Sequence, residues 1–143
     1  MADTQRMGFE GRVLYGTAGA TGTTDLTNAK DITYGFAKES GDTTVRGAGT
    51  SPPIRTEKVT QRVVDIEFVM LNDSADTSLE AIRVAAYAGT PIAIRTKDYS
   101  SGKGFDGDCT AAVSHPYPLN GEQVVTITCN PTRDEGRDPS LYV

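Results

Sequence analysis

The longest strand-like stretch of the sequence, residues 54–71, places the strongest constraint on the fold. Its second half carries apolar side chains at every second position, namely Val64, Ile66, Phe68 and Met70. This period of two predicts a half-buried β-strand. The first half, up to residue 62, is polar on both faces and gains little from a core of its own. We therefore expect that half to project from the body or to be covered by another chain.

The hydrophobic period changes directly after this strand. Residues 73–89 carry apolar side chains at helical spacing. Thr77 followed by Glu80 fits a capping box, and Gly89 fits the glycine that commonly ends a helix. The sequence therefore predicts one helix over about residues 76–88.

Shorter strand patterns lie on both sides of the predicted helix. We expect strands over residues 11–15, 32–37, 43–47, 92–97, 107–114 and 122–130, with a turn at 40–42. Nineteen threonines in 143 residues favour pleated structure as well. Because strands precede and follow a single helix without regular βαβ alternation, the expected fold is mainly β. It is an antiparallel β-sandwich or barrel with one flanking helix.

Chain size and composition bound the possible functions. The 143 residues suit a single domain over residues 1–143, and the net charge of −5 without a Lys/Arg cluster argues against sequence-specific nucleic-acid binding. No apolar run approaches 18 residues, and the start lacks a signal-peptide pattern, so we expect no membrane partner and synthesis in the cytoplasm. Leu, Ile, Val and Phe total only 28 residues, which predicts a small core that gains stability from neighbours.

The two cysteines, Cys109 and Cys129, form no CxxC motif, so no zinc or redox motif is indicated. If the last two strands form a hairpin centred near Leu119, the two thiols face each other on the same side of the sheet. A disulfide would then be geometrically possible in an oxidising setting. Two buried reduced thiols are the alternative that we favour.

Two further groups of residues have side chains of the kinds found in chemical sites. Asp98, Asp106 and Asp108 surround a glycine-rich loop and offer oxygen ligands for calcium, but their spacing matches no EF-hand, and we favour a solvated turn. His115 is the only histidine and has no identifiable triad partner. We therefore expect no catalysis, no cofactor and no metal.

The extended loop over residues 44–57 is the feature that we favour for function. Its flanks are polar on both sides, and two adjacent prolines interrupt any ladder. A surface hairpin without a partner is one interpretation. The other is a docking arm that orders against a neighbouring subunit, as in strand addition. The predicted self-assembly residues are Thr44, Arg46, Gly47, Pro52, Pro53, Arg55 and Glu57.

Several short motifs together resemble one known family. They are residues 30–34 (KDITY), 42–47 (DTTVRG), 88–94 (AGTPIAI), 104–108 (GFDGD), 117–121 (YPLNG) and 139–143 (PSLYV). Their order and spacing over residues 10–143 resemble the tail tube proteins (major tail proteins) of long-tailed bacteriophages. That family is related in fold to the tube protein of type VI secretion.

The resemblance implies a structural virion protein that self-assembles into stacked, hexameric rings. The stacked rings form a hollow tail tube through which DNA passes as non-specific cargo, and the tube is assembled in the host cytoplasm. The implied partners are other copies of the chain, the tape measure, the tail terminator and the baseplate or tip. The loop over 44–57 and two terminal arms, residues 1–10 and 134–143, would mediate stacking.

A conduit for DNA should not bind its phosphates, and a ring of six copies would carry a charge of roughly −30. Asp65 and Glu67 are the candidates for the inner wall. A type VI secretion tube subunit and a secreted calcium-binding β-sandwich module remain as alternative functions.

Overall fold

The computed structural model describes residues 5–143, which form seven strands in one sheet, one α-helix and one short 3-10 helix. The elements are η1 (Gly8–Glu10), β1 (Arg12–Thr17), β2 (Thr24–Asp25), β3 (Ala29–Asp42), β4 (Glu57–Leu71), α1 (Thr77–Ala88), β5 (Ile92–Lys97), β6 (Asp106–Ser114) and β7 (Val124–Thr132). The strand order is β2-β1-β5-β6-β7-β4-β3, and all neighbours are antiparallel. The expected mainly β fold with one helix is confirmed. No helix within residues 5–143 is long and apolar enough to cross a membrane.

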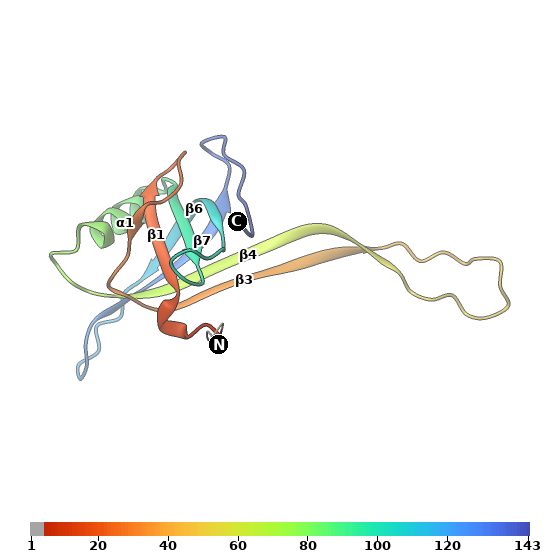
Figure 1. Cartoon of the computed structure of the whole chain (residues 1–143), viewed down its shortest axis with the longest axis horizontal. Coiled ribbons are helices and arrows are strands. Elements are labelled where there is room, and N and C mark those ends of the chain that lie inside the picture. The colour runs from red at the N-terminus through yellow and green to blue at the C-terminus, as the bar shows by residue number, and fades with distance from the viewer. Residues whose placement is uncertain (1–4) are drawn as a thin grey trace.

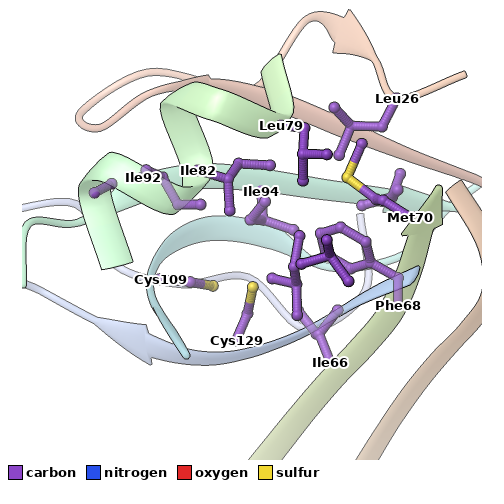
Figure 2. Close-up of a cluster of buried hydrophobic side chains, with 14 of the residues drawn as sticks. Leu26, Ile66, Phe68, Met70, Leu79, Ile82, Ile92, Ile94, Cys109 and Cys129 are labelled. Atoms are coloured by element: carbon purple, nitrogen blue, oxygen red, sulfur yellow. The ribbon is translucent and has the colours of Figure 1, made fainter. Parts of the chain in front are cut away.

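The alternating pattern of β4 becomes an alternating pattern of burial. The side chains of Val64, Ile66, Phe68 and Met70 are at most 6% exposed, whereas Asp65 and Glu67 between them are exposed and Val69 is half-buried. Helix α1 covers the apolar face of the sheet, as Figure 2 shows. The helix contributes Leu79, Ile82 and Ala85 to this core. Much of the core therefore lies between one helix and one face of the curved sheet, and Leu26 and Phe105 from loops complete it.

The sheet curls until its two sides approach each other, as in an incomplete barrel. Strand β1 contacts β3, although the two lie at opposite sides of the strand order. The ring of Tyr34 in β3 packs against Phe105, with 6.4 Å between ring centroids. The Tyr34 hydroxyl donates a hydrogen bond to the carbonyl of Leu141, and Leu141 packs against the core. The C-terminal segment thus fills the open side of the curled sheet.

The last residues of the expected terminal tail, residues 134–143, are bound to the sheet. Ser140 pairs with Asp106, and Val143 pairs with Gly104, through backbone hydrogen bonds of 2.8–3.1 Å. After the loop over residues 133–139, the chain therefore returns beside the start of β6 and pairs with it. The last four residues are therefore held by the sheet itself.

The expected N-terminal arm, residues 1–10, is described from residue 5 onward. Within it, Gly8–Glu10 form η1, and the Glu10 carboxylate accepts a hydrogen bond of 2.7 Å from the backbone of Met7. Phe9 remains 86% exposed. The described part of the arm thus has local structure but does not bury its aromatic side chain.

Helix α1 begins and ends close to the predicted bounds, but its cap residue is Asp76. The Asp76 carboxylate accepts hydrogen bonds from the backbone N–H groups of Ser78 (3.1 Å) and Leu79 (3.3 Å). The predicted cap, Thr77, is instead the first helical residue. A carboxylate can accept both bonds at once and also suits the positive end of the helix dipole. Gly89 ends the helix in the left-handed conformation, at φ 75°, as expected.

Strands β3 and β4 form a long hairpin that projects far from the body (Figure 1). The predicted turn at residues 40–42 and strand at 43–47 are wrong, because β3 continues through Asp42. Gly41 pairs with Lys58, and a bulge lies between Glu39 and Ser40. Ladder hydrogen bonds to β4 override the local turn preference of the Ser-Gly-Asp sequence.

Candidate assembly surfaces

The tip of the long hairpin carries the residues predicted for self-assembly. Residues 43–56 belong to no strand, and most of their side chains are exposed, including Val45 (75%) and Ile54 (84%). In an isolated copy, these two aliphatic side chains remain in water and gain nothing from burial. The tip is therefore a candidate contact surface.

Threonine side chains close the base of this tip. The backbone N–H of Thr56 donates to the Thr44 hydroxyl (2.9 Å), and the Thr43 and Thr56 hydroxyls are 2.8 Å apart. The Thr44 side chain and backbone both donate to Asp42, which lowers the pKa of that carboxyl. Arg55 forms an exposed ion pair of 3.3 Å with Glu57. These contacts hold the two chains of the hairpin together just before the tip opens.

The remaining predicted residues of this loop lie on the open tip itself. Arg46, Gly47, Pro52 and Pro53 are all exposed. Gly47 has a φ of 71°, which favours glycine at this bend. The structure brings the seven predicted residues onto one projecting element, and their role in assembly stays a prediction.

Asp65 and Glu67 lie on the face of the sheet opposite the core. Glu67 pairs with Thr33 on one side and Thr128 on the other, and Asp65 pairs with Gly35. Because direct cross-strand partners share a face, the registers define an acidic sheet face. It consists of Thr33, Gly35, Asp65, Glu67, Val69, Thr110, Ala112, Ser114, Thr126, Thr128 and Asn130.

Over these positions, the acidic sheet face carries two carboxylates and no basic side chain. Toward the start of β6, the same side of the sheet carries Asp106 and Asp108, which are paired with Arg137. The other members of the acidic sheet face are uncharged: glycine, alanine, valine, serine, threonine and asparagine. No Lys or Arg among these positions offers a phosphate an ion pair. The chemistry of this surface is therefore to repel a polyanion while remaining wettable.

The three aspartates considered for calcium do not gather into one site. Asp106 and Asp108 are bound by Arg137, at N–O distances of 3.0 and 3.2 Å, and Asp106 also faces Arg95 at 3.6 Å. Asp98 instead accepts a hydrogen bond of 3.0 Å from the backbone of Lys103. In the described part of the chain, no three His, Cys, Asp or Glu side chains form a group suited to a metal ion.

The Arg137 clasp, which we define as Arg137, Asp106 and Asp108, was not expected from the sequence. Asp108 is fully buried and also accepts a hydrogen bond of 2.9 Å from the backbone of Gly19. The clasp thus ties the C-terminal loop and the turn after β1 to strand β6. Strand alternation places Asp108 on the outer face of β6. It is buried because the C-terminal loop with Arg137 and the turn with Gly19 cover it.

The cysteine register differs from the predicted one. Cys109 pairs with Pro131 and Cys129 pairs with Ala111, so the expected direct pairing of the two cysteines is wrong. The connection between β6 and β7 is centred near Asn120, which shifts every pair by two residues and keeps every side chain on its face. The thiols are diagonal neighbours, a longer separation than a disulfide prefers.

Both cysteines are free and fully buried, and their sulfur atoms point into the same part of the core (Figure 2). Burial raises the pKa of the Cys129 thiol to about 12, and burial and the nearby Cys129 raise that of Cys109 as well. Protonated buried thiols are poor nucleophiles. The two residues therefore act as small core side chains.

His115 lies at the end of β6, where its Nε2 is 3.2 Å from the Gln123 side-chain oxygen. The imidazole ring meets the edge of Tyr117, with 4.7 Å between centroids. Neither Gln123 nor Tyr117 is a carboxylate that would orient the ring for catalysis. His115 therefore packs against the turn that follows β6.

Comparison with known proteins is informative only at the level of structure. No family model and no curated protein matches the sequence. A chain from the tail of an empty gene transfer agent particle, determined with C6 symmetry, superposes with a TM-score of 0.75 at 14% identity, covering 96% of this chain and 98% of that one. A chain from the native gene transfer agent virion gives 0.72 at 14% identity and the same coverage. The SPP1 tail tube gives 0.66 at 10% identity, covering 88% and 75%. The chain therefore has the fold of virion tail tube subunits.

Proposed function

We propose that the chain is a structural subunit of a virion tail tube, which assembles as stacked hexameric rings around a channel for DNA. The observation that carries the proposal is the projecting hairpin of a fold shared with tail tube subunits. In an isolated copy, the outer edge of the 14-residue strand β3 is not covered by another strand of the sheet, and the tip of the hairpin is exposed. Both obtain partners when copies assemble.

Strand addition is the chemistry available to the hairpin. Among residues 5–143, strand β3 is paired only with β4, so its other edge presents unpaired N–H and C=O groups along most of its length. Edges of this kind attract another chain unless they are protected. A repeated contact between two different surfaces of identical copies closes into a ring or continues as a helical filament.

The acidic sheet face is the proposed inner wall. Two carboxylates from each copy, without a basic side chain between them, would line the channel with negative charge. Each phosphate paired with Lys or Arg would strengthen DNA binding and slow its passage. The absence of such cations from this face is therefore the property that a conduit needs.

The deletion of residues 47–53 tests the assembly part of the proposal. The hydrogen bonds of Thr43 and Thr44 with Thr56 lie outside the deleted segment, so the hairpin ladder should survive. We expect a folded monomer, with an unchanged far-UV circular dichroism spectrum, that forms no tubes in negative-stain electron microscopy. Long tubes from the deletion variant would contradict this role of the tip.

Replacement of Asp65 and Glu67 by lysine tests the inner wall. We expect the double variant still to form tubes, because the acidic sheet face is not the docking surface. The variant tubes should retain DNA in a salt-dependent manner, whereas wild-type tubes should not. A variant in which Asp134 and Asp138, both exposed and outside this face, become lysine gives the matched control. Equal DNA retention by both variants would exclude the acidic sheet face as the wall.

Within a virion, the proposed partners at the ends of the tube are the tape measure, the tail terminator and the baseplate or tip. The finished location is the tail, after assembly in the host cytoplasm. Copurification of tube ends with these proteins from infected or induced cells is the direct measurement.

A further inference from the structure

The hairpin has two chemically different faces, and the face opposite the acidic one carries an unusual pair of cations. Lys38 of β3 pairs directly with Arg62 of β4, two residues beyond the Phe36–Val64 pair and therefore on the same face. Val64 is buried in the core, whereas Phe36 on the same face is 63% exposed. We define Phe36, Lys38 and Arg62 as the basic hairpin patch.

The basic hairpin patch is incomplete in an isolated copy. Like charges directly opposite each other on a sheet are destabilising. Lys38 and Arg62 are both exposed, and neither side chain has an ion-pair partner within residues 5–143. Next to them stands a largely exposed phenylalanine ring. This combination fits a partner surface that offers a carboxylate beside apolar side chains.

Helix α1 presents such a surface. Glu80, Val84 and Tyr87 have the spacing i, i+4 and i+7, which places them along one side of the helix. Val84 is 57% exposed and Tyr87 is 97% exposed. The Glu80 carboxylate is exposed and has no partner in the described part of the chain. We define these three residues as the α1 stripe.

The two surfaces cannot meet within one copy. Figure 1 shows α1 on one side of the body and the hairpin leaving toward the other side along the longest axis. A contact between them must therefore join different copies. Such a head-to-tail contact uses two different surfaces and repeats from copy to copy, which is the geometry of a ring or filament.

We infer that the basic hairpin patch of one copy docks on the α1 stripe of the next copy. Arg62 and Lys38 face Glu80, and Phe36 packs against Val84 and Tyr87. This inference rests on the proposed function, since it specifies which surfaces join the subunits. Nucleic acid is the less suitable anion, because the other face of the same hairpin carries Asp65 and Glu67 and repels phosphates.

Charge reversal tests the pairing. Arg62→Glu and Glu80→Arg, each as a purified full chain, should raise the concentration needed for tube formation by about tenfold or more, which is about 1.4 kcal/mol. An equimolar mixture of the two variants should assemble again. In an alternating arrangement, the reversed patch meets the reversed stripe, and the two unchanged surfaces meet each other. The double variant R62E/E80R should also assemble.

Further variants separate docking from folding. Asp134→Arg reverses an exposed charge outside both surfaces and should leave assembly unchanged. Because Glu80 lies in the first turn of α1, its reversal also weakens a favourable interaction with the helix dipole. Thermal unfolding followed by circular dichroism checks that each variant is folded. Tyr87→Ser, which leaves all charges unchanged, should also impair assembly.

The outcomes distinguish this inference from the function on which it rests. If the wild-type chain forms no tubes in concentrated solution under any condition, the proposed function fails. If the wild type assembles and the folded single variants assemble equally well, the docking pair is wrong. It is also wrong if the single variants fail and their mixture does not recover. Tubes of Arg62→Glu that form normally but lose bound DNA would assign the cations to nucleic acid instead.

Discussion

Replacing Arg137 with alanine removes the cation that holds the buried carboxylate of Asp108. Asp108 is fully buried and would keep only the hydrogen bond from the Gly19 backbone. Breaking one side of a buried ion pair typically costs 3–5 kcal/mol, since it leaves a charge without compensation. The Arg137 side chain is itself 21% exposed, so we take the lower end, about 3 kcal/mol. For a chain of this size, that loss lowers the midpoint of thermal unfolding by about 6–12 °C.

The exposed ion pair between Arg133 and Asp138 in the same loop provides the control. Its side chains are 73% and 83% exposed, so Arg133→Ala should cost at most about 0.5 kcal/mol. Urea unfolding of each monomeric variant, followed by far-UV circular dichroism, measures the difference. Asp108→Asn combined with Arg137→Ala should recover much of the lost stability, because no charge is then left buried. Equal losses for Arg137→Ala and Arg133→Ala would refute the argument that burial determines the strength of the clasp.

Four further predictions concern the core and the helix. Burial raises the pKa of the Cys109 thiol and raises that of Cys129 to about 12. The contribution of the two protonated thiols to the free energy of unfolding should therefore be fully present below the pKa of an unfolded thiol, near 9, and should be lost as the pH rises from there toward 12. Urea midpoints between about pH 7 and 11 measure this loss. At pH 8 the native thiols should react with a thiol reagent only at the rate of unfolding. Asp76→Ala should cost about 1 kcal/mol through loss of the helix cap, with Asp73→Ala as the comparison. Gly89→Ala should cost a similar amount, about 1 kcal/mol, because φ is 75° there; an unchanged urea midpoint would contradict it.

Local patterns were sufficient for the elements whose residues interact mainly with their own neighbours. The period of two in β4 identified both the buried Ile66 and Phe68 and the exposed Glu67. The helical spacing and Gly89 identified α1 to within one residue. These features follow from backbone geometry, which assigns alternate strand residues to opposite faces and every third or fourth helical residue to one face.

Features that depend on a distant segment could not be read in this way. The turn expected at residues 40–42 is absent because pairing with β4 extends the strand through Gly41. The register between β6 and β7 depends on which residue lies at the centre of the connection that joins them. A shift of this register by two residues leaves the hydrophobic pattern of both strands unchanged. Sequence periodicity therefore contains no information that would distinguish the two registers.

The candidate surfaces also combine features that the sequence predicts with features that depend on the tertiary structure. The sequence alone determined a mainly β chain with one helix, a polar strand extension and acidic residues at 65 and 67, because these depend on alternation and composition. Only the tertiary structure decided that Lys38 stands opposite Arg62, that α1 lies on the far side of the body, and that Arg137 reaches Asp108. Each of these depends on chain segments that meet only after the sheet has curled, and the free energy of those contacts is not a property of any local stretch of sequence.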